Sequence, residues 1–287
     1  MHSVIPGAPA VGPLHDDYAV TAEFYDVLQA EQDAARVRHL YGRDVAAARV
    51  GVLDIGAGTG RVTELSVRES RAGVHAVEPA RAMRAPLMTR LAALPPALRQ
   101  RVTVHPHTLE ETGLREVADV AVCHNTVACL APDARRTLWP ALAGALVPGG
   151  SLVLQLPPPR LPDTDVVRLF APQRIGEHTY GGHMVLSAVE GRVRTRCHYW
   201  VRGSEGLLRE HAETFWMWPA TRAELLGDLA GHGFVPLPSR ADPAVLALSL
   251  GGPRDPSDTV CRTARRHGTR ARQGHVRAAH AWAVCRL

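Results

Sequence analysis

The segment from Val52 to Gly60 constrains the fold more than any other part of this chain. An apolar run interrupted only by Asp54 leads into three alternating glycines, Gly56, Gly58 and Gly60, and a helical pattern follows at once. Glycine adopts positive φ and lets a ligand approach the main chain, while the first turn of a helix presents unpaired N–H groups. The segment therefore predicts a strand, a tight turn and a helix start that together bind a cofactor.

The spacing of these glycines indicates which kind of cofactor. A dinucleotide site uses G-x-G-x-x-G, whereas this turn reads G-x-G-x-G and carries Asp54 two positions before its first glycine. A carboxylate at that place repels a pyrophosphate but suits a cationic amino-acid group such as that of S-adenosylmethionine.

A second acidic residue follows the next predicted strand. The apolar run from Ala72 to Val77 ends in Glu78 and Pro79. This order places a carboxylate at the carboxyl end of the second strand, where it can accept hydrogen bonds from both hydroxyls of a ribose.

With these motifs the sequence resembles the class I S-adenosylmethionine-dependent methyltransferases. Leu53–Gly60 is similar to the family's first motif and Val77–Met83 to its second, while Ala118–Cys123 and Leu146–Leu154 resemble its fourth strand and its turn into the fifth. The resemblance covers roughly residues 18 to 250. It implies a Rossmann-like α/β fold whose seven-stranded, mostly parallel sheet ends in a reversed strand. It also implies that S-adenosylmethionine is the cofactor and S-adenosylhomocysteine the product.

The resemblance assigns one group of residues to the cofactor. Tyr25 lies in a segment similar to the aromatic lid of these enzymes, although an ordinary core aromatic fits it equally well. Thr108 stands where the family has an acid that contacts adenine, which is a departure. Cys123 suits a buried small side chain better than a nucleophile. The predicted cofactor-binding residues are Tyr25, Asp54, Gly56, Ala57, Gly58, Gly60, Glu78, Pro79, Met83, Thr108, Leu109 and Cys123.

Composition limits the partners of the protein. The formal net charge is +5, but eight arginines and only two aspartates between residues 253 and 287 give that segment +6, so the rest carries −1. The chain contains no lysine, and nucleic acid is not an expected partner, although binding of the basic tail to RNA or another anionic surface stays open. The five cysteines form no C-x-x-C pair, so we expect neither a disulfide framework nor a metal site. The apolar stretches are short and the start lacks an export signal, so we expect a cytoplasmic protein with no membrane segment.

The pattern along the chain predicts four regions. Residues 1–15 form a disordered leader, 16–49 N-terminal cap helices, 50–250 the methyltransferase domain, and 251–287 a basic, disordered tail. Within the domain, prolines after the fifth strand break the β-α alternation, and three β-like runs follow. We therefore predict a three-stranded antiparallel insertion after strand 5, spanning residues 160–218, that covers the substrate.

The loop after the fourth strand faces the methyl group in this family. Here it begins with His124 and lacks the Asn/Asp-Pro-Pro-aromatic signature of enzymes that methylate amide or base nitrogens. His124 is therefore the candidate catalytic base, or a group that orients the acceptor. A histidine that only caps the strand or packs on adenine is the alternative.

Polar and aromatic residues of this loop and of the insertion form the predicted acceptor site. Alternate strand residues share a face, so His178 and Tyr180 are expected together, Trp216 and Trp218 as a stacked pair, and His183 on the face opposite to His178. A tryptophan pair that serves only as core is the alternative. The predicted substrate-binding residues are Asn125, His178, Tyr180, His183, Trp200, Trp216 and Trp218.

These features favour a tailoring methyltransferase of natural-product biosynthesis. N-methylation of an amine on a small molecule or modified peptide is the first hypothesis, because an aromatic wall binds cationic groups. O-methylation of a hydroxyl or carboxyl with His124 as base is the second. A noncatalytic cofactor- or RNA-binding protein on the same fold is the third. Homodimer formation is left open.

Overall fold

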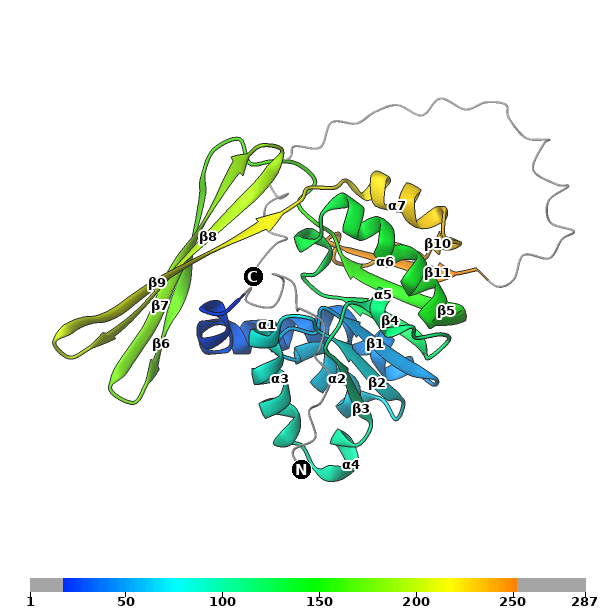
Figure 1. Ribbon diagram of the computed structural model, residues 1–287, viewed down its shortest axis with the longest axis horizontal. Coiled ribbons are helices and arrows are strands. Elements are labelled where there is room, and N and C mark those ends of the chain that lie inside the picture. The colour runs from blue at the N-terminus through cyan, green and yellow to red at the C-terminus, as the bar shows by residue number, and fades with distance from the viewer. Residues whose placement is uncertain (1–17, 252–287) are drawn as a thin grey trace, which may run out of the picture.

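A seven-stranded sheet forms the centre of the protein, whose computed structural model describes residues 18–251 (Figure 1). Its spatial order is β10-β11-β5-β4-β1-β2-β3. The strands from β1 to β5 run parallel, whereas β11 is antiparallel to β5 and to β10. The predicted mostly parallel sheet with a reversed last strand is therefore confirmed. Its strands are β1 (Gly51–Ile55), β2 (Gly73–Val77), β3 (Val102–His105), β4 (Ala118–Cys123), β5 (Leu146–Gln155), β10 (Phe234–Pro236) and β11 (Val245–Leu250).

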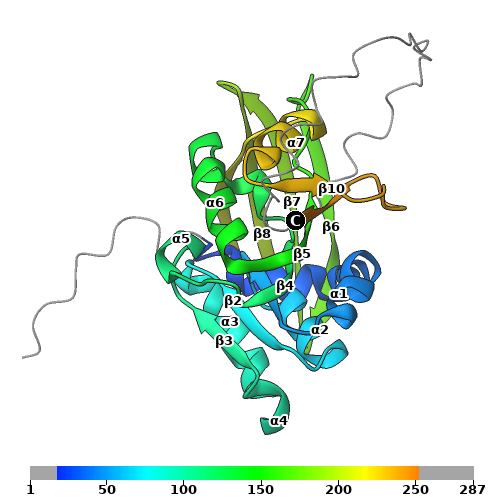
Figure 2. The ribbon, with the colours of Figure 1, turned by 90° about the vertical axis from the view of Figure 1, so that its right-hand side faces the viewer.

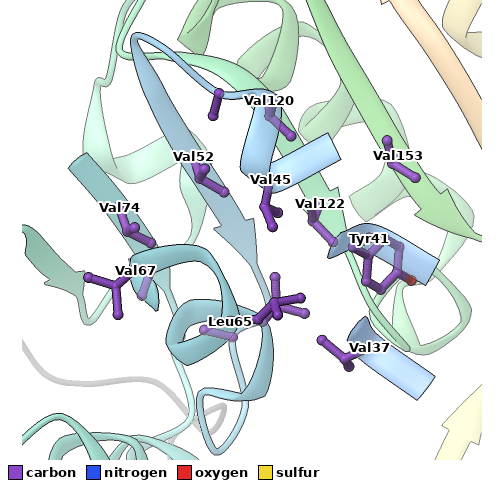
Figure 3. Close-up of a cluster of buried hydrophobic side chains, with 14 of the residues drawn as sticks. Val37, Tyr41, Val45, Val52, Leu65, Val67, Val74, Val120, Val122 and Val153 are labelled. Carbon is purple, nitrogen blue, oxygen red and sulfur yellow. The ribbon is translucent and has the colours of Figure 1, made fainter. Parts of the chain in front are cut away.

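Helices cover both faces of this sheet. Alternate strand residues point to opposite faces, so Val52 of β1 packs in a cluster with α1, α2 and α3, while Leu53 packs in a cluster with α6 and α7. Figure 2 shows α1 and α6 on opposite sides of the strands, and Figure 3 shows Tyr41 and Val45 of α1 in the first cluster. The helices are α1 (Thr21–Ala47), α2 (Arg61–Glu69), α3 (Arg81–Ala92), α4 (Pro96–Arg99), α5 (Leu109–Thr112), a 3-10 turn at Val127–Cys129, α6 (Pro132–Ala145) and α7 (Arg222–Ala230).

The insertion after β5 forms a separate antiparallel sheet of four strands, β6 (Val166–Ile175), β7 (His178–Val189), β8 (Arg192–Gly203) and β9 (Gly206–Met217) (Figure 1). The prediction of three strands was wrong because β6 is an edge strand with an obscure pattern. Pro172 interrupts it at a register shift, and most of its residues are partly or fully exposed. The turn at Gly176, with φ of 59°, separates β6 from β7.

A single long helix replaces the predicted N-terminal cap helices. α1 has 27 residues, so it is about 40 Å long and reaches both sheets. Phe24 and Leu28 near its start pack in the core of the four-stranded sheet, and the Phe24 ring stacks on Tyr199 at 4.6 Å between centroids. Val37 and Tyr41 near its end pack against the main sheet.

Two regional predictions, for the leader at 1–15 and for the tail beyond residue 251, lie outside the described residues. Among the helices between residues 18 and 251, none is long and apolar enough to cross a membrane.

The first residue of β1 gives a test of the central packing. A Cβ on Gly51 would lie 2.2 Å from the backbone oxygen of Val117, whereas a Cβ on Gly73, its register partner at the start of β2, would meet only Arg101 O at 3.8 Å. Gly51→Ala should lower the free energy of unfolding by about 2 to 3 kcal/mol because backbone must move. Gly73→Ala should change it by less than about 1 kcal/mol. Urea unfolding of both variants measures this, and equal effects would contradict the packing described.

Candidate functional site

The carboxyl ends of β1, β2 and β4 open into a cavity of about 470 Å³ that the inner face of the four-stranded sheet covers. Residues of the main domain and α1 that line it are Gln29, Ile55, Gly56, Gly58, Val77, Glu78, Pro79, Ala80, Met83, Thr108, Leu109, Glu110, His124, Asn125, Thr126, Cys129, Leu130, Ala131, Ala134 and Leu138. The side facing the insertion is lined by Tyr18, Thr21, Tyr25, Tyr199, Phe215 and Trp218.

The three glycines of the first turn have different roles. All have positive φ, at 67° for Gly56, 56° for Gly58 and 89° for Gly60. A Cβ would lie 2.4 Å from Thr126 Oγ1 at Gly56 and 2.4 Å from a Leu87 methyl at Gly60, so these two glycines are needed for packing. At Gly58 the nearest atom would be 3.8 Å away, on Met83, so this backbone borders open cavity. Gly60, although predicted to bind the cofactor, lines neither this cavity nor the smaller pocket described below.

Glu78 is fixed at the end of β2 by backbone donors. Its Oε2 accepts from the Gly58 N–H at 2.7 Å and its Oε1 from the Ala80 N–H at 2.8 Å. Burial raises the pKa of this carboxyl, and the two N–H donors partly oppose that rise. Each oxygen keeps a further lone pair, so the carboxylate can accept the two ribose hydroxyls.

Asp54 is almost completely buried beneath the glycine turn. Its Oδ2 accepts from the Thr63 hydroxyl at 2.6 Å. Burial, with a smaller contribution from the negative charge of Glu78, raises the pKa of Asp54 to about 7. The positive charge of Arg84 lowers the pKa of Glu78, but burial outweighs it, so the pKa of both carboxyl groups is raised. Buried carboxylates of this kind suit a positively charged ligand.

A smaller pocket of about 40 Å³ adjoins the main cavity at the glycine turn. Its lining includes the carboxylates of Asp33 and Asp54 and the guanidinium of Arg61, and it shares Tyr25 and His124 with the main cavity. Arg61 Nη2 donates to Asp26 at 2.9 Å, but Arg61 Nε is buried and has no hydrogen-bond partner within the part of the chain that the structure describes. An orphaned donor beside two carboxylates fits a ligand that carries both charges, as the amino-acid end of S-adenosylmethionine does. Sequence reasoning missed Asp33 and Arg61.

Pro79, Met83, Thr108 and Leu109, all predicted to bind the cofactor, line the main cavity, and Thr108 is the residue predicted at the adenine contact. The Thr108 hydroxyl donates its hydrogen to Glu111 Oε2 at 3.0 Å. The Thr108 oxygen can therefore only accept a hydrogen bond from a ligand, and an adenine amino group is a donor. Ala57 lines the smaller pocket, whereas Cys123 is fully buried and lines neither cavity.

His124 is held on both sides of its ring. Nε2 lies 3.0 Å from Asp33 Oδ1, and Nδ1 lies 3.1 Å from the Tyr41 hydroxyl. A carboxylate only accepts, so Nε2 carries a hydrogen, and burial raises the pKa of Tyr41, which keeps its proton and donates it to Nδ1. This arrangement leaves the ring no lone pair for a substrate proton.

The predicted acceptor residues are divided between the two faces of the insertion sheet. Asn125 and Trp218 line the cavity. Tyr180 lies on the inner face, 6.1 Å from the Phe24 ring, and His178 shares that face but is exposed at the end of its strand. Neither lines the cavity.

The remaining three predicted acceptor residues lie on the outer face. His183 stacks on His198 at 4.8 Å, Trp200 lies over Gly181 beneath Arg202, and Trp216 lies beneath Arg192. The predicted pairing of Trp216 with Trp218 was wrong, because Trp218 follows the end of β9 and its N–H bonds to Ala128 O.

Inner-face aromatics that sequence reasoning missed complete the acceptor side. Tyr18 stacks on Phe215 at 4.7 Å, and the Tyr199 hydroxyl lies 3.1 Å from Thr21 Oγ1. Strand periodicity does not show that Tyr199 and Phe215 share a face, because that depends on the register of β8 and β9. In the structure Thr195, which is on the same face as Tyr199, lies opposite Phe215.

Comparison with known proteins agrees with this geometry. Residues 53–152 match the family described as a methyltransferase domain, and a search of curated proteins found no match. The structure resembles an amino pentose methyltransferase from Micromonospora echinaspora, with TM-score 0.57, 23% identity and coverage of 77% of this chain and 90% of that chain. It also resembles a sugar N-methyltransferase from Streptoalloteichus, with TM-score 0.57, 20% identity and coverage of 88% and 100%. A methyltransferase from Clostridium acetobutylicum gives TM-score 0.60, 15% identity and coverage of 82% and 99%.

The fold is the one that these methyltransferases share. The chain carries a methyltransferase domain and is an S-adenosylmethionine-dependent methyltransferase.

Glu78 offers the most direct test of the ribose contact. Glu78→Ala should weaken binding of S-adenosylhomocysteine at least about tenfold, because charge-assisted hydrogen bonds are lost. Glu110→Ala is a matched control, since Glu110 also lines the cavity but bonds to Thr137. Calorimetric titration measures both, and equal losses would contradict the assigned role of Glu78.

Asp54 should leave a signature in the stability of the unliganded protein. Because its folded pKa is raised to about 7, ionisation opposes folding, and this cost grows as pH rises from the unfolded pKa through about 7. Relative to the wild type, Asp54→Asn should therefore gain roughly 2 to 3 kcal/mol of unfolding free energy between about pH 5 and about pH 8. Urea unfolding at the two pH values checks this, and a constant difference would mean that Asp54 titrates normally.

Proposed function

We propose that this methyltransferase N-methylates an amine on a natural-product small molecule or modified peptide. The observation that carries the proposal is the aromatic lining of the cavity on the side of the insertion, formed by Tyr18, Tyr199, Phe215 and Trp218 in the same cavity as Glu78. Aromatic faces and carboxylates both stabilise a cationic group, and an amine becomes cationic as it receives a methyl group.

The chemistry requires alignment more than a catalytic base. The bound cofactor supplies a methyl group on a sulfonium, and a neutral amine attacks it in line once the two atoms are held at roughly 3 Å. The aromatic lining would orient the acceptor and exclude water. Asn125, which has a φ of 55° directly after His124, lines the same cavity and would help to orient the acceptor.

The relatives of known activity support an amine acceptor. Two of the similar structures are described as an amino pentose methyltransferase of calicheamicin biosynthesis and a sugar N-methyltransferase. Their identities of 20–23% define a shared fold, so the acceptor of this protein is inferred from its own cavity and their activities only agree with it.

O-methylation is the second candidate, and the geometry of His124 disfavours it. A hydroxyl acceptor gains from a general base, but both ring nitrogens of His124 are already engaged by Asp33 and Tyr41. With either acceptor, residues 160–218 would act as the substrate lid. The same proposal includes an N-terminal cap at residues 16–49 and a methyltransferase domain at residues 50–250.

Paired acceptors test the proposal. The purified protein is given S-adenosylmethionine with amino sugars and with their hydroxyl counterparts, and methylated products are located by mass spectrometry and NMR. We expect methylation at nitrogen only. Methylation confined to the hydroxyl compounds would overturn the proposal.

Two tryptophans supply a matched pair for the acceptor side. Trp218→Leu should raise the KM for the amine about tenfold, because Trp218 lines the cavity, whereas Trp216→Leu should leave it unchanged, because Trp216 lies on the outer face under Arg192. Equal effects on steady-state kinetics would mean that the acceptor does not bind against the inner face.

A further inference from the structure

A chain of three hydrogen-bonded side chains that no motif describes leads from the core to the smaller pocket, which Asp33 and His124 line. The Tyr41 hydroxyl contacts His124 Nδ1 at 3.1 Å, and His124 Nε2 contacts Asp33 Oδ1 at 3.0 Å. Tyr41 and Asp33 come from α1, eight residues apart on the same helix, and His124 follows β4. Tyr41 is fully buried and the other two residues are 9% exposed, so the chain is sheltered from water except toward the pocket.

The direction of these hydrogen bonds makes Asp33 the group that acts on a ligand. Tyr41 donates a hydrogen bond to His124, and His124 donates one to Asp33, so the Asp33 carboxylate is the final acceptor of the chain. Asp33 ends the chain and lines the pocket beside the glycine turn. The imidazole therefore fixes the orientation of the carboxylate and leaves the remaining lone pairs of the carboxylate for a donor in the pocket.

Arg61 lines the same pocket with the complementary charge. Its Nη2 is bound to Asp26, which fixes the guanidinium, while its buried Nε has no partner among the described residues. A pocket of about 40 Å³ has space for only a few non-hydrogen atoms, which is the size of an ammonium and carboxylate on one carbon.

We propose that this pocket binds the amino-acid end of the cofactor, with Asp33 accepting from the ammonium, Arg61 Nε donating to the carboxylate, and His124 and Tyr41 acting as positioning residues for Asp33. His124 then contributes to cofactor affinity and removes no proton from the acceptor. The proposal depends on the cofactor alone and is independent of which acceptor is methylated.

Two ligands separate this role from a general structural one. S-adenosylhomocysteine carries the amino-acid end, whereas 5′-methylthioadenosine keeps the adenosine and the thioether but lacks that end. Calorimetric titration of the full-length protein with both gives an affinity ratio for each variant. Asp33→Asn should weaken S-adenosylhomocysteine about tenfold or more and leave 5′-methylthioadenosine unchanged.

The positioning residues and the control should behave differently. His124→Leu removes the donor to Asp33, so it should weaken S-adenosylhomocysteine about threefold to tenfold, again with no effect on 5′-methylthioadenosine, and His124→Asn should partly restore binding if its amide reaches Asp33. Glu78→Ala should weaken both ligands by the same factor, because both contain the ribose.

Two results would overturn the proposal. An equal loss of both ligands in Asp33→Asn would show that Asp33 only supports the fold of the cavity. Unchanged binding of both, together with reduced turnover, would assign Asp33 to the acceptor. If Asp33→Asn does not fold, an S-adenosylhomocysteine analogue without its α-amino group tests the same contact on the wild-type protein. We expect it to bind about tenfold more weakly than S-adenosylhomocysteine, and equal affinity would refute the contact with Asp33.

Discussion

The packing of α1 into two cores is the constraint on which both sides of the cavity depend. Phe24 and Leu28 belong to the core of the four-stranded sheet, and Tyr41 belongs to that of the main sheet. Polar contacts near the start of the helix join it to both parts of the protein: the Glu213 carboxylate of β9 accepts the Thr21 N–H at 2.8 Å, and Asp26 bonds to Thr59 and Arg61 at the glycine turn and to Arg90 of α3. Displacing this one helix would therefore open the acceptor side and the cofactor side together.

The sequence allows prediction of those parts of the site that local rules determine. The glycine turn and Glu78 follow from strand ends and from positive φ, and both line the cavity as a strand-to-helix turn requires. The Asp33–His124 contact joins residues 91 positions apart, and no local pattern connects them. The acceptor residues of the insertion could not be predicted for a similar reason. Tertiary packing decides which face of β8 meets α1, and Tyr199 points toward α1 whereas Trp200, which was predicted at the acceptor site, points away.

The buried carboxylates oppose the stability of the unliganded protein and favour its ligand. Burial raises the pKa of both Asp54 and Glu78, and the negative charge of Glu78 raises the pKa of Asp54 further. A cationic ligand would offset this cost, whereas an anionic one would add to it. Asp54 and Glu78 therefore favour binding of a sulfonium over a phosphate, and the same two side chains lower the stability of the unliganded protein.

This electrostatic arrangement also bears on the proposed choice between nitrogen and oxygen as the methyl acceptor. Transfer to a neutral amine moves a positive charge from sulfur to nitrogen, so the cavity contains one cation before and after the reaction. Transfer to a hydroxyl instead ends with a neutral ether and a proton that a base must remove, and His124, which lines the cavity, has both ring nitrogens engaged. Aromatic faces on the acceptor side, at Tyr18, Phe215 and Trp218, would stabilise a cation at that position. The cavity is therefore suited to N-methylation, in which the single positive charge moves from sulfur to nitrogen and stays in the cavity.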